Sequence, residues 1–198
     1  MTIVGGLLLV LDGSMWDASR TSNQLVATTL TLGGDVTNGG LFATEAELDR
    51  ERWQAIVIHH SASPVGDVAT MTRQQIAHGF EGLGYHFVIG NGNGMPDGSI
   101  HPGPAWQFQQ PGRHAIGSNG PWFNEHALGI CLVGNGDSRG FTEHQMQRLV
   151  LLVRQLQQRL EIPADRVFLH REIADDIRSP GQFFAEASFR QQLIMEPR

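Results

Sequence analysis

Two histidines, His59 and His170, each follow a short apolar run in distant parts of the chain. The runs are residues 56–58 (Ile-Val-Ile) and 167–169 (Val-Phe-Leu). Such runs predict buried strands, and a side chain just past a strand lies at the rim of the sheet, where ligands bind in α/β folds. Two histidines at this rim could hold one metal ion, although the pattern alone is also typical of two unrelated buried histidines.

The composition predicts an ordinary globular domain. The chain has 198 residues, enough for one domain with a short extension, and 40% of them are hydrophobic. The net charge of -6 and the lack of Lys and Arg clusters argue against a nucleic-acid partner. The single cysteine, Cys131, lies in the apolar run 128–133, which predicts a buried strand residue rather than a nucleophile.

The N-terminal part differs from the rest of the chain. Residues 3–11 form an apolar run without the basic flank and cleavage site of a signal peptide, and the run is too short to span a bilayer. It is either a strand or the remnant of an anchor, so membrane anchoring stays open. Residues 12–43 are rich in Ser, Thr, Gly, Asn and Asp. We therefore expect an extension over residues 1–43 and a domain over residues 44–198.

Within that domain, strand and helix patterns alternate. A capping box at Thr44 and Glu47 predicts a short helix running to Arg52. Another helix is expected from about 68 to 78, with Asp67 as its N-cap. Strands are expected over residues 55–59, 85–90, 128–133 and 166–169, with short strands or turns at 100–101 and 106–109.

The strongest helix pattern begins at Thr142. This residue and Gln145 form a capping box, apolar residues follow at helical spacing, and Pro163 ends the pattern. That apolar stripe indicates a core-facing helix. Together, the elements predict a single α/β domain with a central mixed β-sheet flanked by helices.

Five stretches carry a resemblance to a known family. They are residues 56–63 (IVIHHSAS), 82–90 (GLGYHFVIG), 112–115 (GRHA), 128–135 (LGICLVGN) and 169–181 (LHREIADDIRSPG). In order and spacing they resemble the zinc-dependent N-acetylmuramoyl-L-alanine amidases, a family that includes the peptidoglycan recognition proteins. The resemblance runs from about Trp53 to Phe184 and implies an amidase-like fold, a zinc cofactor and peptidoglycan or muropeptides as partner. Such a partner implies a location in the cell envelope or outside the cytoplasm, with a cytoplasmic location left open.

The resemblance also implies a ligand set for the zinc ion. His59 and His170 match the two histidine ligands, and His60 is expected to pack or hydrogen-bond behind them. The family carries Cys or Asp as third ligand before a Pro-Gly pair, and here Ser179 stands at that position. A neutral hydroxyl is a poor zinc ligand. Asp176, or its neighbour Asp175, is an alternative source of a carboxylate.

Catalytic and substrate-binding residues follow from the same comparison. Tyr85 matches a tyrosine near the reacting water, where a phenol can stabilise the oxyanion. The family places Lys or Thr two residues before the third ligand, but this chain has Ile177, so Arg178 either replaces that donor or points to solvent. The residues expected to contact substrate are His114, His86 and Trp106. Because side chains alternate along a strand, Tyr85 and His86 can share the site only if the strand twists or ends there.

The resemblance therefore predicts zinc-dependent hydrolysis of the N-acetylmuramoyl-L-alanine bond in peptidoglycan or its fragments. The alternative is a peptidoglycan-binding module without catalysis, because Ser179 replaces the usual anionic ligand. A scaffold with no cell-wall ligand is a third interpretation. Bound zinc separates the first two, and binding to insoluble peptidoglycan separates both from the third.

Overall fold

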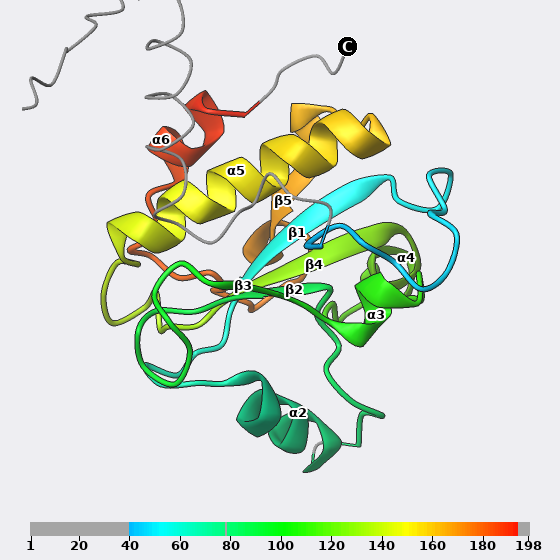
Figure 1. Ribbon diagram of the computed structural model, residues 1–198. Helices are drawn as coiled ribbons and strands as arrows, with labels where there is room; N and C mark the ends of the chain where they lie inside the picture. The colour runs from blue at the N-terminus through cyan, green and yellow to red at the C-terminus, as the bar shows by residue number, and fades with distance from the viewer. Residues whose placement is uncertain (1–39, 78, 194–198) are drawn as a thin grey trace, which may run out of the picture. The chain divides into compact units, whose positions relative to one another are not determined.

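A five-stranded sheet forms the centre of the fold in a computed structural model that describes residues 40–77 and 79–193 (Figure 1). The strands are β1 (Ala55–His60), β2 (Phe87–Ile89), β3 (Ile100–Pro102), β4 (Ala127–Leu132) and β5 (Val167–Leu169). Their order is β3-β2-β4-β1-β5, with β3 antiparallel to β2 and all other neighbours parallel. The predicted mixed sheet is thus confirmed, whereas the expectations for residues 1–39 fall outside the described part.

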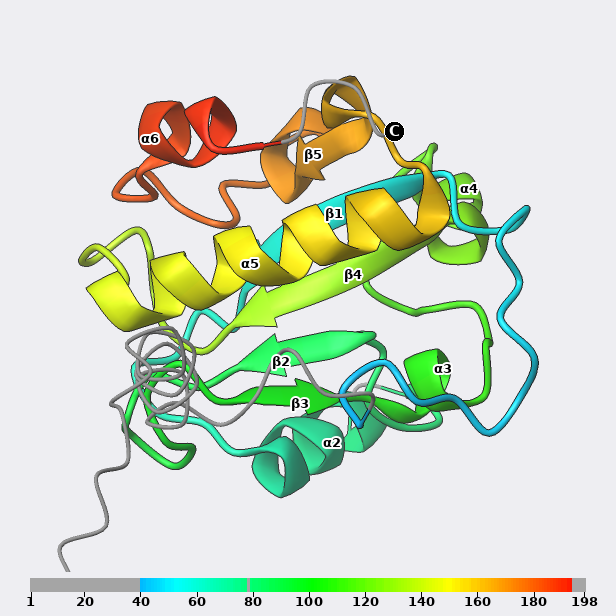
Figure 2. The ribbon, with the colours of Figure 1, turned by 45° about the horizontal axis from the view of Figure 1, so that its top comes forward.

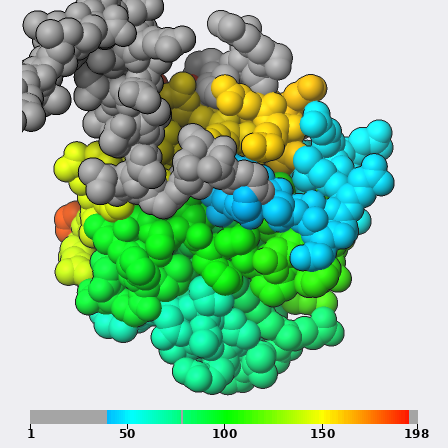
Figure 3. Space-filling view, viewed as in Figure 1, coloured from blue at the N-terminus to red at the C-terminus, as the bar shows by residue number. Residues whose placement is uncertain are grey.

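Helices cover both faces of this sheet. They are α2 (Val68–Ala77), α3 (Pro104–Gln107), α4 (Gly120–His126), α5 (Glu143–Leu160) and α6 (Glu186–Gln191), with 3-10 turns η1 (Ala164–Arg166) and η2 (His170–Glu172). Figures 1 and 2 show α5 along one face and α2 on the other side. Seen from the same side as Figure 1, the segments around β3 and α2 form a continuous surface, green above teal (Figure 3).

The alternation of side chains along β1 divides the core in two. Ile56 and Ile58 point toward α5, where they join a cluster that includes Leu152. Ala55 and Val57 point to the opposite face and belong to a separate, smaller cluster. Because His59 continues the second series, it lies on the face opposite α5.

Helix α5 forms as its sequence predicts. The Thr142 side chain accepts a hydrogen bond from the Gln145 N–H, and the Gln145 side chain accepts one from the Thr142 N–H, so the capping box is complete. The helix ends at Leu160, and Glu161 adopts a left-handed conformation with φ of 57°. The N-cap of α2 is also confirmed, since Asp67 accepts from the Thr70 N–H at 2.7 Å.

Two local expectations are wrong. No helix forms over residues 44–52: the Glu45 N–H donates to the Gln107 carbonyl at 2.7 Å, and the Asp49 side chain accepts from the Arg52 N–H at 3.0 Å to close a turn. Residues 106–109 were expected to form a short strand or a turn, but Trp106 lies in the short helix α3. Helix α4 was not expected from the sequence. Among the helices of the described part, none is long and apolar enough to cross a bilayer.

Candidate active site

The sheet register explains how two distant histidines meet. In the parallel pair β1–β5, Ile58 lies opposite Leu169, so the next residues, His59 and His170, emerge together at the carboxyl ends of the two strands. Their ring centroids are 4.3 Å apart. Residues His59 and His170 are 1% and 8% exposed. The structure therefore brings the two proposed metal ligands side by side in a buried position.

His114 joins this pair from the loop before α4. Its ring centroid lies 5.0 Å from that of His59, and the His59 Nε2 and His114 Nδ1 atoms are 3.1 Å apart. The remaining ring nitrogen, Nε2, donates to the Ala127 carbonyl at 3.0 Å. Burial lowers the pKa of His114 to about 4, so the ring is neutral near pH 7. Both nitrogens of His114 face protein atoms, which leaves neither free for a substrate.

Tyr85 reaches the same face because β2 begins only at Phe87. Both Tyr85 and His86 precede the strand, so the alternation of a regular strand does not apply to them. The Tyr85 ring centroid lies 5.3 Å from that of His59. Burial raises the pKa of Tyr85 well above its usual value, which keeps the hydroxyl protonated and able to donate. The ring also lines a pocket of about 170 Å³ together with residues from α2.

His86 has a different environment from Tyr85. It is fully buried against the Trp53 ring, with 4.8 Å between the centroids. Its Nδ1 accepts from the Gly129 N–H at 3.0 Å, and its Nε2 donates to the Gln110 carbonyl at 3.2 Å. Because the backbone engages both nitrogens, the ring links the segment before β2 to β4 and to the loop at Gln110.

Trp106 lies away from this site. It is 1% exposed and belongs to the core on the α5 side. Its ring centroid lies 5.1 Å from that of Phe87 and 6.3 Å from that of Phe42. The expectation that it contacts substrate therefore has no support in the geometry. The periodicity of a short segment next to prolines gave no indication of which face the ring would take.

The candidate ligands on the loop before Pro180 differ in burial. Ser179 is 8% exposed, and its hydroxyl oxygen accepts from the His60 N–H at 3.0 Å. Asp175, Asp176 and Arg178 are exposed. Within the described residues, no group of three His, Cys, Asp or Glu side chains is arranged to hold a metal ion. Asp176 therefore does not complete a ligand set with the two histidines in this arrangement.

The environment of His170 nevertheless fits a bound ligand. Its Nε2 is buried and has no hydrogen-bond partner among the residues that the structure describes. Leaving such an atom unpaired costs about 1–3 kcal/mol. Burial lowers the pKa of His170 to about 4 and also lowers that of His59, so both rings are neutral near pH 7 and each carries one lone pair. This set of groups fits a zinc ion: the two neutral imidazoles would be strong donors, and the Ser179 hydroxyl would be a weak one.

Two residues that support the site were not identified from the sequence. Gly129 lies in the buried strand β4, and a Cβ atom there would come within 2.5 Å of the His114 ring. Asn124 of α4 accepts from the backbone N–H groups of His114 and Ala115 at 2.8 and 2.9 Å. A glycine inside an apolar strand often marks such a close approach, so the sequence alone could have indicated that another group packs against Gly129.

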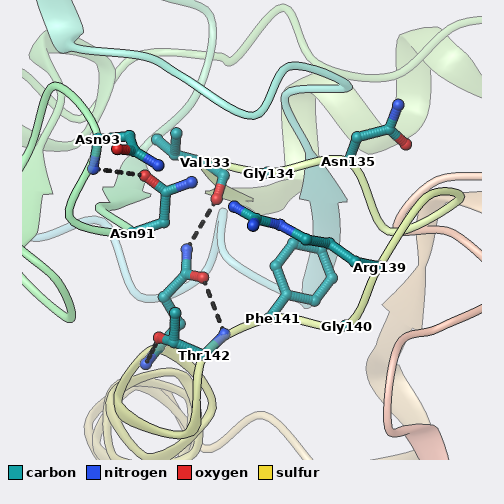
Figure 4. Close-up of a pocket in the computed structure, with 10 residues that line it drawn as sticks. Asn91, Asn93, Val133, Gly134, Asn135, Arg139, Gly140, Phe141 and Thr142 are labelled. Atoms are coloured by element: carbon teal, nitrogen blue, oxygen red, sulfur yellow. Dashed lines mark hydrogen bonds between the residues drawn. The ribbon is translucent and has the colours of Figure 1, made fainter.

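A separate cavity of about 320 Å³ lies beyond the carboxyl ends of β2 and β4 (Figure 4). Its polar lining is largely engaged in the protein: Gln145 donates to the Ile89 and Val133 carbonyls, and Asn91 donates to the Pro64 carbonyl. None of the site histidines lines it. The cavity is therefore distinct from the histidine site.

Comparison with known proteins identifies relatives. Residues 49–182 match the family Amidase_2, N-acetylmuramoyl-L-alanine amidase. The sequence is 32% identical to the endolysin of Escherichia phage T7 over 133 residues, which are 63% of this chain and 79% of that protein. The family match over residues 49–182 includes all five strands and the segments that carry His59, His114 and His170.

Solved structures have a similar fold. The endolysin N-acetylmuramoyl-L-alanine amidase LysCS from Clostridium intestinale aligns with a TM-score of 0.61 and 26% identity, covering 71% of this chain and 83% of that one. The peptidoglycan recognition protein PGRP-LE, solved in complex with tracheal cytotoxin, aligns with a TM-score of 0.57 and 21% identity over 73% and 84% of the two chains, which shows the fold alone. From the family match and the T7 relative, the chain belongs to the N-acetylmuramoyl-L-alanine amidase family.

Proposed function

We propose that this protein hydrolyses the amide bond between N-acetylmuramic acid and L-alanine in peptidoglycan or its fragments, with zinc as cofactor. The observation that carries the proposal is the unpartnered, buried Nε2 of His170 beside the His59 ring. A site that served only packing would leave this nitrogen unsatisfied at a net cost. Membership of the amidase family supports the same interpretation.

His59 and His170 would hold the metal, with the Ser179 hydroxyl as a weak third donor. Zinc in such a site acts as a Lewis acid that activates water and polarises the scissile carbonyl. The neutral state of both imidazoles suits this role because protonated rings have no lone pair to offer. Because the third donor carries no charge, we expect a lower zinc affinity than a thiolate or a carboxylate at this position would give.

Tyr85 is the residue that we assign to the transition state. Its hydroxyl is protonated, its ring lies 5.3 Å from that of His59, and it borders a pocket that a substrate group can enter. A donor in this position stabilises the charge that develops on the carbonyl oxygen. Arg178 is exposed on the loop before Ser179, so we assign the oxyanion contact to Tyr85 alone.

A second function, binding of peptidoglycan without hydrolysis, is favoured by one specific observation. The position of the third ligand holds Ser179, whose hydroxyl accepts from the His60 N–H, in place of a thiolate or carboxylate. If zinc affinity is too low for the ion to remain bound, the same face could still recognise cell-wall fragments. Catalysis and binding therefore have to be measured together.

The deciding experiment measures zinc content, release of soluble L-alanyl peptides and sedimentation with insoluble peptidoglycan. The wild type should contain zinc, release peptide and sediment. His170→Ala should lose zinc and release but keep its fold. Tyr85→Phe should keep zinc and sedimentation while turnover falls about 10²–10³-fold, the scale for one oxyanion donor. Sedimentation without release, even with added zinc, would establish the binder, and release that survives in Tyr85→Phe would remove Tyr85 from the mechanism.

A further inference from the structure

We propose that His114 is a positioning residue, which fixes the tautomer of His59 so that the Nδ1 of His59 presents its lone pair to a ligand. The ligand is zinc if the proposed function holds, but the tautomer itself can be tested without metal. The inference assigns to His114 a role different from substrate contact. It rests on a chain of two hydrogen bonds that begins at the backbone of β4 and ends at the His59 ring.

The first step of this chain sets the proton of His114. A carbonyl oxygen can only accept a hydrogen bond. The Ala127 carbonyl lies 3.0 Å from the His114 Nε2, so that nitrogen must carry the proton. The neutral ring has one N–H, which leaves the His114 Nδ1 as an acceptor.

The second step sets the proton of His59. The His114 Nδ1 is an acceptor, and the His59 Nε2 faces it at 3.1 Å, so the His59 Nε2 must be the donor. The remaining nitrogen, Nδ1, then holds the lone pair, and no described residue makes a hydrogen bond to it. Ligand histidines in metal sites are usually oriented by a hydrogen bond to the other ring nitrogen, and a change in that partner weakens metal binding about 10–100-fold.

The surroundings hold His114 in this one position. The Asn124 side chain accepts from the N–H groups of His114 and Ala115 and donates to the Ala115 carbonyl at 2.9 Å. Gly129 leaves the space for the ring, since a Cβ atom there would lie 2.5 Å from it. The ring is 5% exposed. A histidine whose backbone and both ring nitrogens are held by hydrogen bonds has a fixed orientation. It is therefore suited to orienting a neighbouring ring, and less suited to adapting to a bound substrate.

The test compares two variants at this position. His114→Gln keeps an acceptor and a donor on one planar group, whereas His114→Phe fills the space with neither. The first measurement is the ¹⁵N spectrum of the His59 ring in metal-free protein, which distinguishes the two neutral tautomers. The wild type should show the proton on Nε2, His114→Phe should show a mixture, and His114→Gln should restore most of the wild-type signal. His86→Gln, next to the same cluster, is the matched control and should leave the His59 signal unchanged.

The second measurement is zinc affinity by competition with a chelator. We expect His114→Phe to bind zinc about 10–100-fold more weakly, and His114→Gln to recover most of that loss. A proton on Nδ1 of His59 in the metal-free wild type would overturn the inference whether or not any variant folds. If the wild type binds zinc, an equal zinc affinity in His114→Phe would also overturn it. If the tautomer is as stated but the wild type binds no zinc, the inference stands and the proposed function fails.

Discussion

The two faces of the sheet are built in different ways. On the α5 face, large apolar side chains interlock: Ile56, Ile58, Ile130 and Leu152 are fully buried in one continuous cluster. On the opposite face, the same strands carry Ala55, Val57 and Gly129; the first two belong to a small apolar cluster, and the His114 ring lies within 2.5 Å of where a Cβ atom of Gly129 would be. Burying a polar ring costs free energy unless its nitrogens are hydrogen-bonded, and on this face His86 and His114 have hydrogen bonds at both ring nitrogens.

This difference indicates that the two faces of a single strand have different roles. Along β1, Ile56 and Ile58 point into the core, whereas the next residue, His59, points into the candidate site on the opposite face. The apolar face stabilises the fold, because close-packed aliphatic groups bury area without a need for partners. The histidine face holds an unpartnered nitrogen at His170, which lowers stability unless a ligand binds. Substitutions on the two faces should therefore have separable effects on unfolding and on zinc binding.

The largest effect on stability should come from the α5 face. Leu152→Ala removes a side chain with no exposed surface from the main core cluster and should lower the free energy of unfolding by about 2–5 kcal/mol. The neighbouring variant Leu151→Ala is the control, because that side chain is 47% exposed and should change stability by less than about 0.5 kcal/mol. Urea unfolding measures both. If Leu152→Ala also abolished zinc binding at temperatures where it is folded, the two faces would not be separable.

A smaller effect, on zinc affinity alone, is expected on the histidine face. Ser179→Cys places a thiolate donor where the hydroxyl now accepts from the His60 N–H. Supplying the anionic third ligand should strengthen zinc binding about hundredfold, or about 3 kcal/mol, most clearly at neutral to alkaline pH where the thiolate forms. Ser179→Ala, which removes the hydroxyl, is the control for the loss of the His60 contact. Unchanged affinity in Ser179→Cys would mean that another group already completes the site.

Most of the fold could be predicted because it follows from local patterns. The α5 helix and its cap follow from a capping box and an apolar stripe, and the buried strands β1 and β4 follow from apolar runs. The failures are short segments whose partners are remote in sequence. Residues 44–52 contain a capping box, yet the N–H groups of Glu45 and Ala46 donate to the Gln107 carbonyl, so a tertiary contact overrides the local preference.

The site was predictable only in part. That His59 and His170 would lie together follows from two strand ends in a parallel sheet, and the register shows why. The function of each further ring depends on which atoms face its nitrogens, and no spacing in the sequence encodes this. His86 and His114 illustrate the limit: both were expected to contact substrate, and the sequence did not indicate that each makes a hydrogen bond to a backbone carbonyl.

The smallest predicted effect concerns the pH dependence of stability. Burial lowers the pKa of His86 from 6.5 to about 3 in the folded protein, with a further contribution from His114. In the unfolded chain the ring titrates near 6.5. Between these two values the unfolded chain binds more protons, so protonation favours unfolding. The stabilising contribution is therefore complete above pH 6.5 and is lost progressively as the pH falls toward 3.

His86→Gln isolates this contribution from those of the other buried rings. The amide can accept from the Gly129 N–H and donate to the Gln110 carbonyl, but it does not titrate. Between about pH 7.5 and about pH 5.5 the wild type should lose roughly 1.4 kcal/mol more of its unfolding free energy than the variant does, the value for a ring kept neutral one pH unit below its unfolded pKa. Urea unfolding at both pH values measures the difference. Equal losses would show that the folded protein accepts a proton on His86 as readily as the unfolded chain does, and that the histidine face is less closed than its hydrogen bonds indicate.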